Sequence, residues 1–81
     1  MKIDEIKKLV ETGREIEFNY KGKKYSITYG YLDNKYVISF CEFYKETSEV
    51  DNFNDLLLVS RDGTSVKKMI EDIDDKDIEI F

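Results

Sequence analysis

The first residues of the chain carry apolar side chains at three- and four-residue spacing, which is the period of an amphipathic helix. The apolar positions are Ile3, Ile6, Leu9 and Val10. Thr12 and Gly13 follow them, and Gly13 can adopt the left-handed conformation that commonly ends a helix. The pattern therefore predicts a short N-terminal helix that stops at Thr12-Gly13.

The apolar period then changes to two residues, which is typical of strands with one buried face. The alternating positions form three groups: Ile16, Phe18 and Tyr20; Tyr25, Ile27, Tyr29 and Tyr31; Tyr36, Ile38 and Phe40. Lys21-Gly22 and Asp33-Asn34 separate the groups, and their residues suit the positive φ angles of two-residue hairpin loops. Closing these loops pairs Phe18 with Tyr25, and Tyr29 with Ile38. Turn chemistry and hydrophobic pattern thus predict the same antiparallel meander.

The opposite face of the predicted meander is mostly polar, which is typical of a sheet face in contact with water. Val37, Cys41 and Phe43 are its apolar exceptions, and all three belong to the third strand. Residues 42–50 are predominantly polar and predict a connection without regular structure. These three residues are therefore a candidate contact surface on an otherwise wet face.

The rest of the chain predicts two helices and a short strand. Asn52 can cap a helix whose apolar side chains are Phe53, Leu56, Leu57 and Val59. Arg61-Asp62-Gly63 would end that helix, and Thr64 or Ser65 would cap the next, with Val66, Met69, Ile70 and Ile73 at helical spacing. Ile78 and Ile80 then alternate with charged residues up to Phe81 and predict a final strand.

The predicted fold class is α+β, in one small domain over residues 1–81. An N-terminal helix precedes a three-stranded antiparallel meander, and two C-terminal helices pack on one sheet face. A core of this size leaves a small stability margin, which makes self-association through Val37, Cys41 and Phe43 a reasonable expectation.

The composition argues against several classes of function. The 81 residues include no His and one Cys, Cys41, so imidazole catalysis, His-ligated zinc and an intramolecular disulfide are excluded. The lack of disulfides favours a cytoplasmic location. No apolar run approaches the roughly 20 residues that span a bilayer. We therefore expect a cytoplasmic protein that is not an enzyme, with no cofactor, no metal and no membrane attachment. Cys41 is interpreted as a structural strand residue rather than a nucleophile.

Charge is distributed unevenly along the chain. Lys and Arg number 13 and Asp and Glu 18, for a net charge of −5. Residues 1–41 hold 8 basic and 6 acidic side chains, whereas residues 42–81 hold 5 and 12. We name as the acidic run Glu71, Asp72, Asp74, Asp75, Asp77 and Glu79. The run lacks the spacing and glycine of an EF-hand loop, so we interpret it as a solvated surface, with contact to a basic protein as the alternative.

The tyrosines and lysines suggest two further hypotheses. Tyr25, Tyr29, Tyr31 and Tyr36 fall on the predicted inner face. We interpret them as the core and its margin, because a base-stacking sheet carries its aromatics on the face without helices. The order of elements resembles the double-stranded-RNA-binding domain, which implies phosphate contacts; the candidate lysines are Lys21, Lys23, Lys24, Lys67 and Lys68. The two-residue loop Lys21-Gly22 is too short for that family's minor-groove loop, so we rank RNA binding last.

Three segments carry a second resemblance. Residues 14–18 (REIEF), 21–27 (KGKKYSI) and 39–43 (SFCEF) resemble segments of small uncharacterised α+β proteins of low-GC Gram-positive bacteria and their phages and mobile elements. The likeness covers residues 3–73. It implies a bacterial accessory protein and no particular activity.

The leading hypothesis is a non-enzymatic cytoplasmic protein that acts by contacting another protein or a second copy of itself. The candidate contact residues are Val37, Cys41 and Phe43 on the sheet and Glu71, Asp72, Asp74 and Asp75 in the acidic run. The alternative is an acidic inhibitor, from a phage or mobile element, that occupies the nucleic-acid site of a basic protein. Direct nucleic-acid binding is the least favoured.

Overall fold

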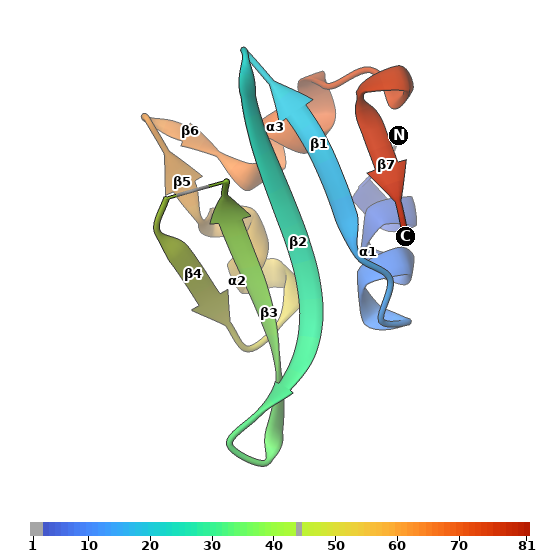
Figure 1. The fold of residues 1–81 in the computed structure, drawn as a ribbon, viewed down its shortest axis with the longest axis vertical. Coiled ribbons are helices and arrows are strands. Elements are labelled where there is room, and N and C mark those ends of the chain that lie inside the picture. The colour runs from blue at the N-terminus through green and yellow to red at the C-terminus, as the bar shows by residue number, and fades with distance from the viewer. Residues whose placement is uncertain (1–2, 44) are drawn as a thin grey trace.

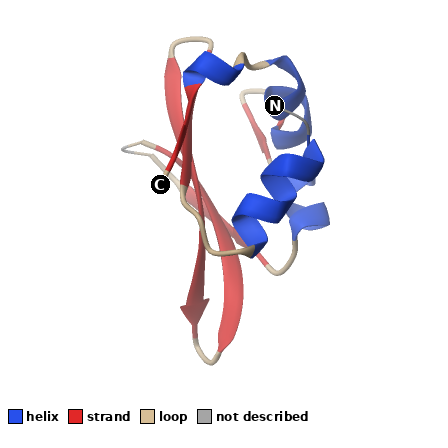
Figure 2. Cartoon of the chain, turned by 90° about the vertical axis from the view of Figure 1, so that its right-hand side faces the viewer, coloured by secondary structure: helices blue, strands red, loops and turns tan. Residues whose placement is uncertain are grey.

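The computed structural model describes residues 3–43 and 45–81, which form a twisted antiparallel sheet with the helices gathered on one face (Figures 1 and 2). In chain order the elements are α1 (Ile3–Glu11), β1 (Ile16–Tyr20), β2 (Lys23–Leu32), β3 (Lys35–Glu42), β4 (Thr47–Val50), α2 (Phe53–Leu58), β5 (Ser60–Arg61), β6 (Thr64–Ser65), α3 (Val66–Asp72), the 3-10 turn Asp75–Asp77 and β7 (Ile78–Ile80). The main sheet has the order β4-β3-β2-β1-β7. The α+β class is confirmed.

Both predicted hairpins are confirmed, including their register. Phe18 pairs with Tyr25 and Tyr29 pairs with Ile38. In the second turn, φ is 49° at Asp33 and 67° at Asn34. Two positive φ angles in succession give the turn a backbone twist that matches the twist of the strands, which is why short Asx-rich loops can connect them.

The helix ends follow the predicted chemistry. Gly13, with φ of 85°, donates its N–H to the carbonyl of Val10 and ends α1. The Asn52 side chain accepts the N–H of Asp55 at 2.8 Å and caps α2. The Ser65 hydroxyl accepts the N–H of Lys68 at 3.1 Å and caps α3. Local sequence signals therefore fix the end of α1 and the beginnings of α2 and α3.

The core lies between the helices and the inner face of the sheet. Tyr25 stacks against Phe18 and Phe40, with ring centroids 5.5 and 5.3 Å away. The buried residues of the core are Ile6, Val10, Ile16, Phe18, Tyr20, Tyr25, Ile27, Ile38, Phe40, Phe53, Leu56, Val66, Met69 and Ile70. Among the described residues, no helix covers the opposite face, as Figure 2 shows from the side. The core therefore draws on α1, α2 and α3 and on the three strands of the predicted meander.

Two predictions for the second half of the chain are wrong in detail. The connection predicted over residues 42–50 contains a strand, because Thr47–Val50 is β4 and pairs with β3. β4 lies at the sheet edge and is half exposed. Polar residues are therefore tolerated in this strand, and the sequence shows no apolar alternation there. The predicted stop Arg61-Asp62-Gly63 is the turn of a small hairpin, β5–β6, with positive φ at Asp62 and Gly63.

The final strand is confirmed. β7 pairs with β1, so that Ile78 lies opposite Phe18. The Phe81 N–H donates to the carbonyl of Glu15 at 2.8 Å, and the Arg14 side chain donates to the carbonyl of Phe81. The predicted three-stranded meander is thus the centre of a five-stranded sheet within the described residues.

Candidate functional site

The hairpin of β2 and β3 extends beyond the helices at one end of the molecule (Figures 1 and 2). β1 covers β2 only as far as the pair Ile16 and Ile27, so residues 28–32 of β2 pair with β3 alone. The hairpin therefore forms an overhang, supported on one side by its own second strand.

Three tyrosines lie together on this overhang, and we refer to Tyr29, Tyr31 and Tyr36 as the tyrosine cluster. The rings of Tyr29 and Tyr36 are stacked, with centroids 5.2 Å apart and planes 9° from parallel. Tyr31 meets Tyr36 edge to face, with centroids 4.9 Å apart. Tyr31 is 63% exposed and Tyr36 56%, whereas Tyr29 is half-buried at the edge of the core. The cluster is an ordered aromatic surface in contact with solvent.

The sequence interpretation of the tyrosines as core and margin holds for some of them only. Tyr25 is 2% exposed and lies within the core, and Tyr29 lies at its edge. Tyr31 and Tyr36 share the inner face with Tyr25, but no helix reaches their end of the hairpin. The signal available in the sequence was the length of the segments: the first group has three alternating apolar positions and the second has four, so the first predicted strand cannot cover the whole of the second.

A groove separates the tyrosine cluster from the C-terminal end of α1. Its volume is about 380 Å³, and its lining residues are Glu11, Thr12, Gly13, Tyr29 and Tyr36. The Thr12 hydroxyl lies 2.9 Å from the carbonyl oxygens of both Lys8 and Leu9, shares its one hydrogen between them and caps the end of the helix. The lining includes one carboxylate and no basic side chain, and the C-terminal end of a helix adds partial negative charge.

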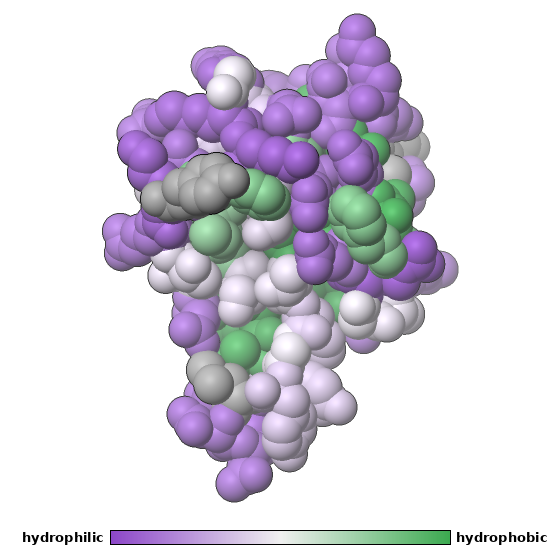
Figure 3. Space-filling view, viewed as in Figure 1, coloured by the Kyte–Doolittle hydropathy of each residue, from purple (hydrophilic) through white to green (hydrophobic). Residues whose placement is uncertain are grey.

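The outer sheet face, seen in Figure 3, has hydrophilic residues around its edge and neutral or hydrophobic residues in its middle. Val37 lies there opposite Gly30 and is only 6% exposed, although it is outside the main core cluster. Phe43 is half-buried, with the Lys24 ammonium 5.2 Å from its ring centre. Cys41 is half-buried too, and its thiol donates to the carbonyl of Glu42 at 3.2 Å.

These outer-face residues do not form one continuous apolar patch. Val37 and Phe43 are six positions apart, roughly 20 Å along an extended chain. Ser39 lies between Val37 and Cys41 on the same face of β3. Each side chain therefore offers a small apolar area among polar neighbours.

Most of the acidic run lies toward the other end of the molecule from the tyrosine cluster, on and after α3, whereas Glu79 lies on β7 (Figure 1). Asp72 accepts the Tyr20 hydroxyl at 3.0 Å and pairs with Lys68 at 3.1 Å. Lys68, followed by the Tyr20 hydroxyl, lowers the pKa of Asp72 below its ordinary value of 3.8. Asp74 borders a hollow of about 270 Å³ that Asp72 also lines. Glu71 is exposed, and Asp75 begins the 3-10 turn.

The acidic residues do not gather as metal ligands do. Over residues 3–43 and 45–81, no three His, Cys, Asp or Glu side chains lie close enough together to hold a metal ion. Within the same part of the chain, no helix has the length and apolar character needed to cross a membrane.

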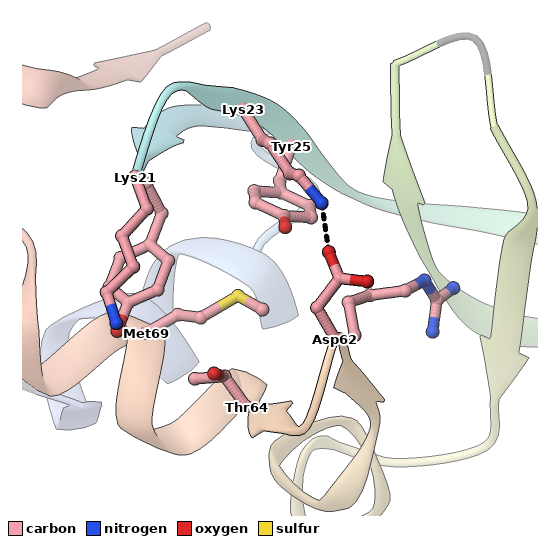
Figure 4. A pocket seen from close by; sticks show the side chains of 8 residues that line it. Lys21, Lys23, Tyr25, Asp62, Thr64 and Met69 are labelled. Carbon is pink, nitrogen blue, oxygen red and sulfur yellow. Dashed lines mark hydrogen bonds and ion pairs between the residues drawn. The ribbon is translucent and has the colours of Figure 1, made fainter.

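A third pocket, of about 250 Å³, lies between the sheet and the β5–β6 hairpin (Figure 4). Lys23 and Asp62 form an ion pair across it, and each shifts the other's pKa toward the charged form: that of Lys23 is raised and that of Asp62 lowered. Tyr25 and Met69 form its floor, and burial raises the pKa of the Tyr25 hydroxyl. Lys23 and Asp62 neutralise each other, but Lys21 and Arg61 also line the pocket, so its lining carries three basic side chains and one carboxylate.

The lysines proposed for RNA are largely engaged with carboxylates of the protein. Lys23 pairs with Asp62, Lys24 lies 3.3 Å from Glu17, and Lys68 pairs with Asp72. Lys21 lies over the ring of Tyr20, its nitrogen 5.4 Å from the centroid. Because these lysines already contact other groups of the protein, they are less available to bind phosphate.

Comparison with known proteins identifies no relative of this chain. No protein-family model matches the chain, and no curated protein and no solved structure is significantly similar to it. The functional argument therefore depends on the geometry of the molecule.

Proposed function

We propose that this chain is a non-enzymatic domain that binds a protein partner through the tyrosine cluster. The observation that carries the proposal is the exposure of Tyr31 and Tyr36, at 63% and 56%, on an overhang that the rest of the fold leaves uncovered. Tyrosine is enriched in protein interfaces because it offers a large rigid apolar area and a hydroxyl at little entropic cost. A cytoplasmic location, expected from the lack of disulfides, is part of the proposal.

Charge near the cluster favours a protein over a nucleic acid. Lys35, close to the turn, pairs with Asp51 at 3.1 Å, and Asp33 lies in the turn itself. The groove beside the cluster contains Glu11 and no basic residue. Phosphate would meet repulsion here, and the chain as a whole carries a net charge of −5.

Partner capture with matched variants tests this proposal. The baits are the unmodified chain, the double variant Tyr31→Ser/Tyr36→Ser and the outer-face variant Phe43→Glu, each exposed to a lysate of the cells that encode the chain. A tyrosine anchor contributes at least about 2 kcal/mol, so the double variant should retain its partner about 30-fold less well. Phe43→Glu should retain it fully.

Two results would contradict the proposal. Equal capture by the unmodified chain and the double variant would exclude the tyrosine cluster as the contact. Loss of partner capture by Phe43→Glu alone would indicate that the contact lies on the outer sheet face predicted from the sequence. Far-ultraviolet circular dichroism of each bait confirms that the fold survives the substitutions.

A second candidate function is the acidic inhibitor of a nucleic-acid-binding protein. The charge of residues 42–81, with 12 acidic and 5 basic side chains, favours it. Such binding should weaken steeply between about 0.05 and 0.15 M salt, where the Debye length shortens to about 8 Å. Capture that resists salt and is lost with Tyr31→Ser/Tyr36→Ser would instead support the tyrosine cluster.

A further inference from the structure

The groove beside the tyrosine cluster combines an aromatic wall with negative potential. Tyr29 and Tyr36 form the wall, and Glu11 with the carboxyl end of α1 lies across from it. Aromatic faces attract cations through the ring quadrupole, and a nearby carboxylate adds Coulomb attraction. The helix end contributes partial negative charge in the same direction. The groove is therefore complementary to a positive group and repels a negative one.

The shape of the groove indicates which class of cation it binds. The rings of Tyr29 and Tyr36 are stacked within 9° of parallel, so one face of each ring is turned toward its partner and the opposite face is turned away from it. A guanidinium is planar, is less strongly hydrated than an ammonium and stacks readily on aromatic rings. It can also donate two hydrogen bonds to one carboxylate, here that of Glu11. A groove of about 380 Å³ has room for such a side chain and the backbone beside it.

We propose that this groove binds an arginine side chain of the partner protein, with the guanidinium between the Tyr29–Tyr36 wall and the Glu11 carboxylate. The inference rests on the proposed function, because it names the chemical group that the tyrosine cluster recognises. It identifies the partner by an exposed arginine rather than by overall basic charge.

A titration monitored by nuclear magnetic resonance tests the inference. The probe is the peptide acetyl-Gly-Arg-Gly-amide, added to ¹⁵N-labelled protein, and its control is the same peptide with citrulline, which keeps the shape and loses the charge. The arginine peptide should shift the amide signals of Thr12 and Gly13 and the ring signals of Tyr29 and Tyr36. The citrulline peptide should cause shifts at least about 3-fold smaller, as expected for the loss of an exposed cation–π contact.

Two variants locate the interaction. Glu11→Gln removes the charge of an exposed residue and should weaken arginine binding about 3- to 10-fold without affecting the fold. Glu5→Gln, on the same helix at its other end, is the matched control and should leave binding unchanged. Tyr36→Leu keeps an apolar side chain and removes the aromatic ring, so it should weaken binding similarly.

Three outcomes would overturn the inference. Equal binding of the two peptides would show that positive charge is not recognised. Shifts confined to the acidic run would place the peptide there instead of in the groove. Absence of shifts from both peptides, together with partner capture that depends on Tyr31 and Tyr36, would refute arginine recognition and leave the proposed function standing. If capture also proved independent of the tyrosines, both would fail.

Discussion

At the scale of the residue, two tyrosines on the same face of the same strand have opposite environments. Tyr25 is 2% exposed and stacks on Phe18 and Phe40, whereas Tyr31 is 63% exposed. Tyr25 and Tyr31 are separated by an even number of positions along β2, so hydrophobic alternation alone assigns both to the inner face. What separates them is whether a helix lies above that position. A buried tyrosine stabilises the fold, and an exposed one is available for contact.

This difference predicts contrasting effects of truncation. Tyr25→Ala should lower the free energy of unfolding by about 3–5 kcal/mol, because it removes a large ring from the core. Tyr31→Ala should lower it by no more than about 1 kcal/mol, since it loses an edge-to-face contact at an exposed site. Urea denaturation of the two variants measures both. Comparable losses would mean that Tyr31 is part of the core and would remove it from the candidate contact surface.

Asp72 provides a second prediction at this scale. Its pKa is held below the ordinary 3.8 by Lys68 and by the Tyr20 hydroxyl, so the ionised carboxylate is favoured in the folded state. Its contribution to stability is present above that ordinary value and is lost as the pH falls through the lower folded-state value. Unfolding measured at pH 6 and pH 3 should show a smaller pH dependence in Asp72→Asn than in the unmodified chain. An unchanged pH dependence would show that the pair does not persist in solution.

At the scale of the element, the β2–β3 overhang determines where the tyrosine cluster lies. Its turn places Asn34 at φ of 67°, in the left-handed region that most side chains avoid. Both strands of the overhang depend on this turn, since β1 supports β2 only up to Ile27. The turn is therefore the element that positions Tyr31 and Tyr36.

Substitution of Asn34 tests the role of the turn. Asn34→Ala should cost about 1 kcal/mol, because alanine is strained at positive φ. Asn34→Gly should cost nothing or stabilise slightly, because glycine tolerates this conformation and Asp-Gly is a favoured hairpin turn. Amide hydrogen exchange should accelerate in Asn34→Ala, first at residues 29–31. Equal stability of the two variants would contradict the left-handed turn.

The elements also show how far the sequence determines the fold. Turn residues and alternation predicted the β1–β2–β3 meander with its register, because two independent signals agreed at Lys21-Gly22 and Asp33-Asn34. β4 could not be predicted from the apolar pattern, because an exposed edge strand such as Thr47–Val50 needs no apolar alternation. The β5–β6 hairpin could not be predicted either, since its strands have two residues each and carry no period.

The candidate site was less predictable than the fold. The outer-face residues Val37, Cys41 and Phe43 were selected because they interrupt a polar pattern, and the structure places Val37 at 6% exposure. The tyrosine cluster depends on the absence of a helix above it, and the groove depends on the distance between α1 and the hairpin. Both depend on tertiary structure, so neither hydrophobic alternation nor composition predicts them.

At the scale of the whole molecule, the apolar and charged features are separated. The tyrosine cluster lies at the end of the hairpin, and most of the acidic run lies on and after α3, toward the opposite end (Figure 1). The sheet carries its helices on one face and leaves the other to solvent (Figure 2). The outer face, the acidic run and the tyrosine cluster are thus three distinct surfaces, and a partner on one leaves the others free.

Site-specific photocrosslinking in living cells tests the central claim most directly. A photoreactive benzoylphenylalanine is placed in turn at Tyr31, at Phe43 on the outer face and at Lys67, an exposed position on α3. We predict a covalent adduct of one defined mass from Tyr31, and none from Phe43 or Lys67. An adduct from Phe43 or Lys67 without one from Tyr31 would contradict the assignment of the tyrosine cluster as the contact surface.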